Sequence, residues 1–283
     1  MKYDFVKSPL NYTGGKYKLL NQIVPLFPKD TKIFVDLFGG GFNVGVNVDA
    51  EVIVYNEFDT NVFNIIKGIY DSEDNILDKI DMLINEYSLS KTNKEGYLTL
   101  REHWNKSENK SWEELYTLIC YSFNHSIRFN SKGEFNIAFG KDRSEFNKTL
   151  RGNFIKFRER IKRNKTYFYN RSFEVLTSNP KVNKDYFFYA DPPYLITTAN
   201  YNENGGWDES MENCLYSELD RVNNLGGKFA LSNVIEHKGK SNDILKEWMK
   251  KYNVHYLNYN YKNCNYQGKD TDKPTIEVLI TNY

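Results

Sequence analysis

The sequence predicts an α/β fold, in which a mostly parallel, doubly wound sheet is interrupted by a mainly helical insertion. Short runs rich in β-branched and aromatic residues alternate with helical patterns, and a glycine cluster lies between the first two runs. Between about residues 60 and 127 the apolar residues keep a helical spacing with no strand pattern among them. The first two observations predict the sheet, and the third predicts the insertion.

The first half of the chain supplies two strands and then the insertion. Strands are predicted at 32–37 and 51–55, and helices at 61–70, 76–87, 112–127 and about 150–163. Gly96 and residues 105–110 are expected to break the helical region. Residues 128–147 are polar and punctuated by glycine, and residues 131–133 can turn a hairpin there, near 128–140.

The sheet resumes in the second half of the chain. Strands are predicted at 166–169, 185–190, 228–232, 255–261 and 275–281, with helices near 208–224 and 241–251. The nearly continuous apolar run at 185–190 is typical of a strand that is buried on both faces. The last two strands are close enough in sequence to pair antiparallel. In such a sheet, ligands bind at the carboxyl ends of the parallel strands.

Composition excludes several classes of protein. The three cysteines, Cys120, Cys214 and Cys264, are odd in number, far apart and without metal-ligand spacing, so neither a disulfide framework nor a metal site is expected. The first residues lack the apolar core of a signal peptide, and no stretch approaches the roughly 18 apolar residues of a membrane span. We therefore expect a cytoplasmic protein without a membrane segment.

Charge is distributed unevenly although the net charge is only +1. Residues 121–165 hold twelve Lys and Arg against four Asp and Glu, whereas residues 71–120 hold six Lys and Arg against eleven acids. A charge run is commonly a solvated helix face, and a surface that binds nucleic-acid phosphates is the alternative.

Glycines and acids follow the first two predicted strands. Asp36 is followed by Gly39 to Gly41, where glycine lets the backbone approach a ligand or serves close packing. Twenty-one residues after Asp36, Glu57 ends the second strand, where nucleotide-binding α/β folds hold a ribose. Alternatively, Glu57 caps the helix that starts near Thr60. Upstream, the run PLNYTGGK at 9–16 predicts an anion or carboxylate site, or only a turn.

The most specific pattern is Asp191-Pro192-Pro193-Tyr194, directly after the buried strand. Two prolines fix the backbone and remove two donors, which leaves rigid carbonyls exposed. The Asp191 carboxylate and the Pro192 carbonyl could accept both N–H groups of a purine amino group, so that its nitrogen attacks the methyl of a sulfonium donor without a covalent intermediate. Tyr194 could then stack on a base that has left the duplex. The alternative is an Asp-initiated turn after a strand.

The motifs PLNYTGGK, DLFGGG, NEFD, FNHSIRFNSKGEFNIAFGK and ADPPY follow one another in this order. Over nearly its whole length the chain therefore resembles the Dam-type DNA adenine methyltransferases of bacteria and their phages. The resemblance implies a Rossmann-like S-adenosylmethionine-dependent methyltransferase domain at 1–70 and 166–283, and an inserted target-recognition domain at 71–165. It also implies S-adenosyl-L-methionine as methyl donor, double-stranded DNA as partner and N6-methyladenine as product. A monomer is expected, and a cognate restriction endonuclease is the protein partner that the resemblance allows.

Matching motif positions imply the site residues. The catalytic set is Asp191, Pro192, Pro193 and Tyr194. The donor site comprises Tyr12, Gly14, Gly15, Lys16, Asp36, Phe38, Gly39, Gly41, Glu57 and Asp191. The DNA site comprises Asn11, Phe123, Asn124, Ser126, Arg128, Asn130, Lys132, Ala138 and Lys141.

Within the DNA site, Arg128 is expected to read a guanine, because arginine pairs bidentately with that base. Phe123 and Asn124 resemble positions that wedge into the duplex, and a core aromatic on the 112–127 helix is the alternative for Phe123. The other basic residues are expected mostly to hold phosphates.

Three residues depart from the pattern of the members that read GATC: Asn11 replaces a lysine, and Ser126 and Ala138 replace larger apolar residues. The target therefore need not be GATC. Other acceptors for the same fold are cytosine N4, adenine in RNA and a protein amide, and a catalytically silent DNA-binding protein is a separate class. The segment 201–207 is predicted to be a loop that closes over the flipped base or simply connects two elements.

Overall fold

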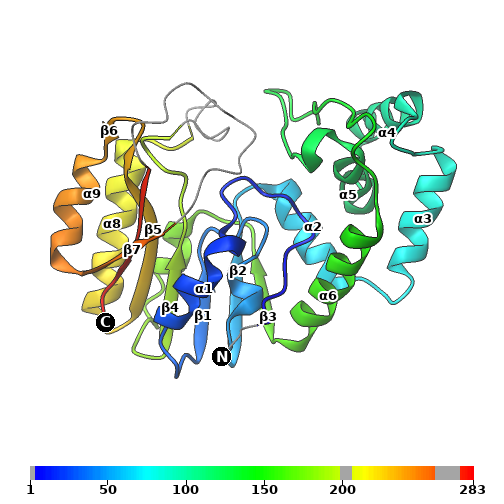
Figure 1. Ribbon diagram of the computed structural model, residues 1–283. Helices are drawn as coiled ribbons and strands as arrows, with labels where there is room; N and C mark the ends of the chain where they lie inside the picture. The colour runs from blue at the N-terminus through cyan, green and yellow to red at the C-terminus, as the bar shows by residue number, and fades with distance from the viewer. Residues whose placement is uncertain (1–3, 198–205, 259–274) are drawn as a thin grey trace.

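A computed structural model describes residues 4–197, 206–258 and 275–283 of the chain. Residues 198–205 lie outside these ranges and hold most of the predicted loop at 201–207. The end of the strand predicted at 255–261 also falls outside them. A central sheet has helices on both faces, and a group of further helices, α3 to α6, lies to its right in Figure 1.

The sheet has the strand order β3-β2-β1-β4-β5-β8-β7, and the short β6 pairs with β5. The strands are β1 (Ile33–Asp36), β2 (Val52–Asn56), β3 (Thr166–Tyr169), β4 (Tyr186–Ala190), β5 (Lys228–His237), β6 (Lys240–Ser241), β7 (Asn253–Leu257) and β8 (Ile276–Thr281). The first five in chain order are parallel, and β8 is antiparallel to both β5 and β7. The predicted doubly wound sheet with an antiparallel last pair is confirmed.

The order of the strands reverses between β1 and β4, which are neighbours in the sheet. From β1 the chain moves outward to β2 and β3, and it then returns to β4 on the other side of β1. Asp36 at the end of β1 is in register with Tyr189 near the end of β4. Such a reversal leaves a crevice outside the carboxyl ends of the two strands, where ligands bind in open α/β sheets. The fold thus places Asp36 and Asp191 together.

Alternate side chains along each strand enter two different clusters, as the period of two in a strand requires. Phe34 and Phe187 pack with the first helices of the chain, whereas Val35 and Phe188 pack on the other face. The helices of the sheet layers are α1 (Leu20–Ile23), α7 (Phe173–Thr177), α8 (Glu209–Asn224) and α9 (Asp243–Trp248), with 3₁₀ turns at Lys16–Leu19, Val24–Leu26, Gly45–Asn47 and Met249–Lys251. Figure 1 shows α8 and α9 together on the left of the sheet.

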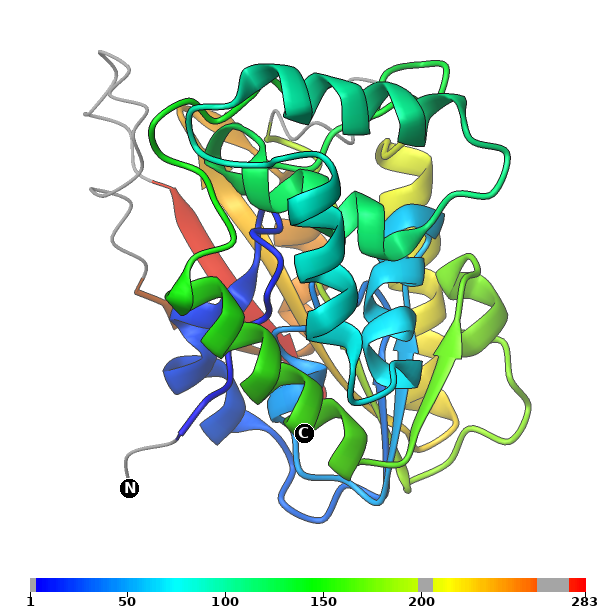
Figure 2. The same cartoon turned by 90° about the vertical axis from the view of Figure 1, so that its right-hand side faces the viewer.

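The region between β2 and β3 is helical, as predicted. It contains α2 (Thr60–Asp71), α3 (Ile76–Glu86), α4 (Lys94–Lys106), α5 (Trp112–Tyr121) and α6 (Lys148–Arg163). Figure 2 shows α3, α4 and α6 facing the viewer in front of the sheet. One cluster of buried apolar side chains runs from the sheet face into these helices. The division at residues 71 and 165 into two domains therefore stays a prediction.

Two expectations for the inserted helices are wrong. Gly96 does not break a helix but lies in the first turn of α4. Glycine is needed at this position because a Cβ would come within 2.0 Å of the Tyr87 carbonyl oxygen. The helix predicted at 112–127 ends at Tyr121 and is followed by a 3₁₀ turn at Phe123–His125. Asn124 in that turn has φ 56°, which no α-helix accommodates.

The polar segment after this turn folds back on itself. Isolated antiparallel bridges join Phe129 to Phe135 and Ser122 to Phe139. Gly133 has φ +75°, which suits a tight turn between the two halves. The predicted hairpin is therefore confirmed as a short, bridged turn rather than as two regular strands.

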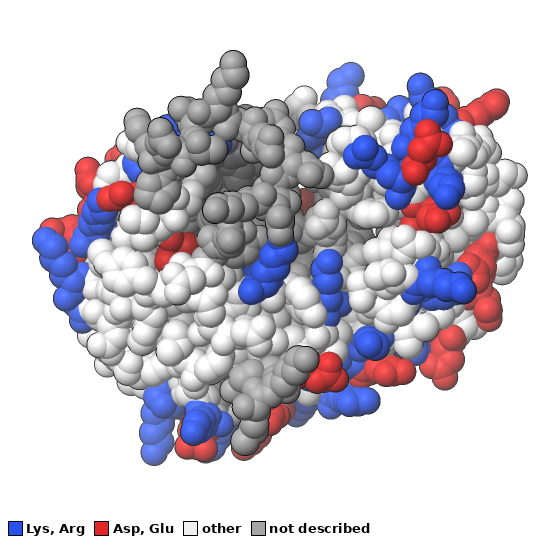
Figure 3. Space-filling model, in the orientation of Figure 1, with Lys and Arg blue, Asp and Glu red and all other residues white. Residues whose placement is uncertain are grey.

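The basic helix α6 is partly neutralised by the acidic stretch before it. Arg151 pairs with Asp81, and Arg158 reaches Asp74 at 2.8 Å and the Ser72 hydroxyl at 2.9 Å. These arginines hold α6 against the preceding helices, and the expectation that the basic residues mostly hold phosphates stays a prediction. Figure 3 shows Lys and Arg side chains, interspersed with acids, over the inserted helices on the right of the molecule.

Candidate active site

The Asp191 carboxylate lies at the centre of the site. β4 ends at Ala190, so Asp191 is the first residue beyond the sheet. Lys16 Nζ is 2.7 Å from Asp191 Oδ1, and the Tyr194 hydroxyl is 3.0 Å from the same oxygen. Among the described residues no donor reaches the second oxygen, Oδ2. The two contacts therefore orient the carboxylate through one oxygen and leave the other available to a ligand.

Lys16 reaches this position because the N-terminal segment turns tightly before it. The Gly15 amide donates to the Tyr12 carbonyl at 3.1 Å, and Gly14 has φ +79°. Lys16 Nζ also donates to the Gly14 carbonyl at 2.9 Å. Burial lowers the pKa of Lys16, but the charges of Asp191 and Glu277 outweigh burial and raise it above its ordinary value. Residues 9–16 therefore form a turn that directs Lys16 to the protein's own carboxylates, and a site for an anionic ligand stays a prediction.

Glu277 on β8 is a member of this cluster that sequence reasoning missed. Its carboxylate is 3.1 Å from the Tyr194 hydroxyl and 3.6 Å from Lys16 Nζ, and the residue is 4% exposed. The available signal was an acidic residue inside the otherwise apolar run of the last strand, TIEVLIT. That acidic residue alone does not reveal that its partner is Tyr194, which lies 83 residues away in the chain.

Asp36 is the last residue of β1, Glu57 directly follows β2, and both are buried. The Gly45 amide donates to Asp36 at 3.1 Å, and burial raises the pKa of Asp36 to about 8. Glu57 accepts the amides of Gly40 at 2.7 Å and Asp59 at 2.8 Å, and burial raises its pKa to about 7. Asp59, not Glu57, caps α2, so the capping interpretation of Glu57 is wrong.

The glycine turn at 39–41 is packed closely against aromatic rings. A Cβ at Gly39 would lie 2.3 Å from the Tyr55 ring, and Gly41 lies against Tyr12. Phe38 emerges from this turn, and its ring centroid is 5.4 Å from Phe173 and 5.6 Å from Trp207. Close packing therefore accounts for Gly39, while the same turn brings Phe38 beside two further aromatic rings.

The charges of the site suit a cationic ligand. The pKa of Asp36 is raised first by burial and further by the nearby charges of Asp191 and Glu57. Burial also raises the pKa of Asp191, although Lys16 opposes the effect. A sulfonium donor with an ammonium group would relieve this concentration of negative charge. The residues present thus fit S-adenosylmethionine. Among the described residues no three His, Cys, Asp or Glu side chains are grouped to hold a metal ion.

The predicted wedge residues project from the 3₁₀ turn after α5. Phe123 is 44% exposed, so its interpretation as a core aromatic is wrong. The guanidinium of Arg143 lies 5.0 Å from the Phe123 ring centroid and 3.3 Å from Asn124 Oδ1. The side-chain amide of Asn11 donates to the Asn124 carbonyl at 2.8 Å, and the backbone amide of Phe123 donates to the Ala138 carbonyl at 2.7 Å. Four predicted DNA-site residues therefore meet here, together with Arg143, which was not among them.

Arg128 is exposed, and its Nε donates to the Asn136 side chain at 2.9 Å across the bridged turn. Asn130 uses its own side chain within the turn, where it contacts Glu134 at 2.7 Å and the Lys132 amide at 3.0 Å. Lys132 and Lys141 are exposed, whereas Ser126 is half-buried and its carbonyl accepts the Ser122 hydroxyl at 3.1 Å. Asn136, which sequence reasoning also missed, thus orients the predicted base-reading arginine.

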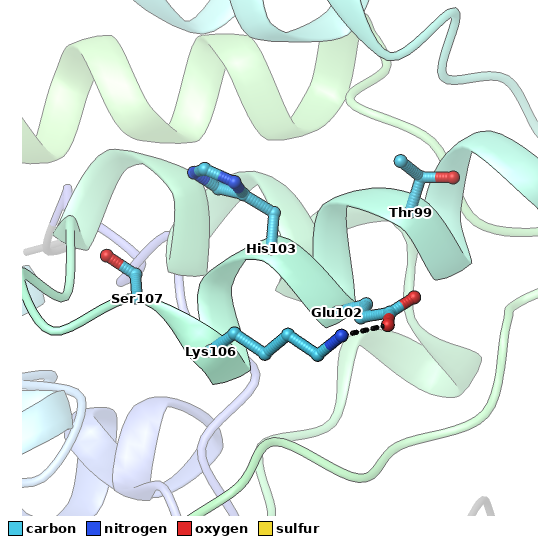
Figure 4. Close-up of a pocket in the computed structure, with 5 residues that line it drawn as sticks. All are labelled: Thr99, Glu102, His103, Lys106 and Ser107. Atoms are coloured by element: carbon cyan, nitrogen blue, oxygen red, sulfur yellow. Dashed lines mark hydrogen bonds and ion pairs between the residues drawn. The ribbon is translucent and has the colours of Figure 1, made fainter.

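A surface pocket elsewhere runs along α4 and is lined by Thr99, Glu102, His103, Lys106 and Ser107. Figure 4 shows these side chains on one stretch of the chain, with Lys106 paired to Glu102 one turn away. None of them belongs to the predicted sites. Within the described parts of the chain, no helix has the length and apolar character needed to cross a membrane.

Strand order and the site at the carboxyl ends of β1 and β4 define a Rossmann-like methyltransferase fold. The model of the D12 class N6 adenine-specific DNA methyltransferase family matches residues 12–263. The chain belongs to this family.

Curated relatives agree with the family. The chain is 44% identical over 285 residues to the type II methyltransferase M.FokI of Planomicrobium okeanokoites, and 42% identical over 291 residues to the modification methylase StsI of Streptococcus sanguinis. Each alignment covers 99% of this chain and 43% of the relative, so the chain spans less than half the length of these proteins. It is also 28% identical to the DNA adenine methylase of Salmonella typhi, over 68% of this chain and 67% of that protein.

Proposed function

We propose that this protein transfers a methyl group from S-adenosylmethionine to N6 of adenine in a short double-stranded DNA site. The observation that carries the proposal is the Asp191 carboxylate at the end of β4, with Lys16 and Tyr194 on Oδ1. Family membership supports the same reaction. When bound, the donor supplies a methyl group activated by its sulfonium, and Asp36, Phe38 and Glu57 are the residues proposed to hold it beside Asp191.

Asp191 and Pro192 act on the acceptor. Asp191 Oδ2 and the Pro192 carbonyl accept hydrogen bonds from the two N–H groups of the adenine amino group. These contacts draw the nitrogen lone pair out of the ring and make the nitrogen more nucleophilic. Once the nitrogen has gained the methyl group it gives up one N–H proton, for which the Asp191 carboxylate is the acceptor. Lys16 holds Asp191 in the orientation that presents Oδ2. This is catalysis by positioning and preorganised electrostatics, with no bond between protein and base. The ring of Tyr194 stacks on the base once it has left the duplex.

The exposed turn after α5 acts on the duplex. Phe123 fills the space that the target base leaves, and Asn124 supports it from the same turn. Arg128 reads a base edge from the neighbouring bridged turn, held by Asn136. Residues 71–165 then form the target-recognition domain, and residues 1–70 with 166–283 the catalytic one. The names of the first relatives suggest a restriction-modification setting, with a cognate endonuclease as partner.

The reaction is tested by incubating the protein with radiolabelled S-adenosylmethionine and, separately, DNA, RNA and protein acceptors. Label is expected only in DNA, and digestion to nucleosides is expected to place it in N6-methyladenine. Label in N4-methylcytosine, in RNA or in protein would identify another acceptor for the same fold. DNA binding without any transfer would establish a catalytically silent DNA-binding protein.

We expect the affinity for S-adenosylmethionine to rise as the pH rises through about 7 and about 8, the pKa values to which burial raises Glu57 and Asp36. A cationic ligand binds best to the ionised carboxylates, so its binding releases the protons that these groups hold at lower pH. Calorimetric titrations in two buffers with different heats of ionisation measure that release. Asp36→Asn should remove the upper part of the pH dependence, and an affinity that does not change with pH contradicts the assignment.

Phe123→Ala is expected to weaken base extrusion by about 1 to 3 kcal/mol, the range for loss of base–aromatic stacking. Fluorescence of 2-aminopurine at the target position, which increases when the base leaves the stack, measures the effect. Tyr167→Ala is the matched control, because Tyr167 is similarly exposed, at 47% against 44% for Phe123, but lies on β3. Equal fluorescence changes in both variants would show that Phe123 is not a wedge.

A further inference from the structure

Glu277 is a buried carboxylate that the proposed mechanism does not yet use. It is 4% exposed, and the next three residues of β8 (Val278, Leu279 and Ile280) are apolar and fully buried. Burying a carboxylate costs free energy unless charged or hydrogen-bonding partners compensate for the lost water. An apolar side chain would fill this strand position without that cost. The contacts of Glu277 therefore indicate what the carboxylate does.

The direction of β8 explains how Glu277 reaches the site. β8 runs antiparallel to β5, whereas β4 and β5 are parallel, so β8 begins at the edge of the sheet where those two strands end. Glu277, the second residue of β8, is in register with Val234 of β5 and Leu257 of β7. This is the edge at which Asp191 follows β4, so Glu277 approaches the catalytic motif from the far half of the sheet.

Glu277 and Asp191 share two partners. The Tyr194 hydroxyl is 3.1 Å from Glu277 Oε1 and 3.0 Å from Asp191 Oδ1. Lys16 Nζ is 3.6 Å from Glu277 Oε1, 2.7 Å from Asp191 Oδ1 and 5.0 Å from the centroid of the Tyr194 ring. The hydroxyl has a single proton, so it can donate to only one of the two carboxylates at a time.

We propose that Glu277 is a positioning residue of the methyl-transfer site. By accepting a hydrogen bond from the Tyr194 hydroxyl and attracting Lys16, it holds the Tyr194 ring in position and keeps Asp191 from taking both partners alone. The stacking face for the base and the orientation of Asp191 are thereby set before the substrate arrives. This inference rests on the proposed function, and it adds a residue on β8 that acts through Tyr194 and Lys16.

The kinetic test compares Glu277→Gln, Tyr194→Phe and the double variant in single-turnover methylation with saturating donor and DNA. Glu277→Gln keeps the size of the side chain and one acceptor oxygen, but it removes the charge that strengthens the hydrogen bond from Tyr194 and attracts Lys16. It should slow transfer by about 10- to 100-fold, as small misplacements of reacting groups do. The dissociation constants for donor and DNA should stay near those of the wild type. When Tyr194→Phe is already present, Glu277→Gln should lower the transfer rate by a smaller factor, because the hydroxyl that Glu277 positions is gone.

Glu236→Gln is the matched control. Glu236 lies on the neighbouring β5, is 43% exposed in its side chain and pairs with Lys246 at 2.7 Å, so the same chemical change occurs outside the site. Its transfer rate should equal that of the wild type. The inference would be overturned if Glu277→Gln transferred methyl groups at the wild-type rate. It would also be overturned if Glu277→Gln lowered the transfer rate by the same factor with and without the Tyr194 hydroxyl. If Glu277→Gln does not fold, Glu277→Asp, which keeps the charge but shortens the reach, is measured in its place.

A second readout separates this inference from the proposed function. The protein is labelled with 3-fluorotyrosine, and the ¹⁹F resonance of Tyr194 is assigned from its absence in Tyr194→Phe. Substitution of Glu277 should shift that resonance without DNA, and Glu236→Gln should leave it in place. Wild-type protein that never methylates DNA refutes the proposed function, whereas an unmoved resonance refutes the positioning role.

Discussion

Asp191→Ala is expected to lower the rate of methyl transfer by about 1000-fold or more, at the upper end of what loss of one preorganised transition-state contact costs. The substitution removes the acceptor of one amino N–H group and the main partner of Lys16, 2.7 Å away. Single-turnover formation of N6-methyladenine measures the loss. Undiminished transfer would refute the proposed mechanism.

The fold of Asp191→Ala should persist, although its free energy of unfolding should fall by about 3 kcal/mol because a buried ion pair loses one partner. Lys16 keeps the Gly14 carbonyl at 2.9 Å and Glu277 at 3.6 Å, which limits the damage. Thermal unfolding and binding of DNA check that the variant is folded. Asp191→Asn is the matched control: it keeps one acceptor oxygen without the charge, so its rate should lie between those of Asp191→Ala and the wild type.

Arg128→Ala is expected to reduce discrimination among DNA sites by about 1 to 3 kcal/mol at one base position, the value of a bidentate contact between arginine and guanine. Methylation of a randomised library of duplexes, read by mapping N6-methyladenine, measures the preference at each position. A uniform loss of affinity over all sequences would instead make Arg128 a phosphate contact.

Two neighbouring variants sharpen the test of Arg128. Asn136→Ala removes the acceptor that holds the Arg128 guanidinium at 2.9 Å, so it should relax the same base position by a smaller amount. Lys141→Ala removes another exposed charge of the predicted DNA site and should weaken binding equally at all sites, with a smaller dependence on salt. Relaxation of the same position by Lys141→Ala would contradict the separate roles of these residues.

Much of the fold could be predicted because it depends on local patterns. Alternation of short strands with helical spacing predicted the doubly wound sheet, and the apolar run at 185–190 predicted β4. The motif Asp191 to Tyr194 follows directly from the end of that strand, so its place at the edge of the sheet could be inferred without coordinates. The antiparallel last pair was also predicted, but the insertion of β8 between β5 and β7 was not.

The sequence misled the prediction where a residue type can serve more than one structural role. Gly96 was expected to break a helix, but its small size serves close packing against the Tyr87 carbonyl. Phe123 had a core position as its alternative, because nothing in the helical spacing shows that α5 ends at Tyr121. The pairing of Arg151 and Arg158 with Asp81 and Asp74 was not predicted, because these acids lie about 70 to 85 residues away in the chain.

The sequence by itself determined the fold class, the family resemblance and the chemical types at the site, because these depend on residue identity and on spacing within single elements. Only the tertiary structure decided which side chains meet. It brought Lys16, Asp191, Tyr194 and Glu277 together from three segments of the chain, and it placed Asn136 against Arg128. The reason is physical: strand order and direction, which local patterns do not specify, determine which distant residues share one edge of the sheet.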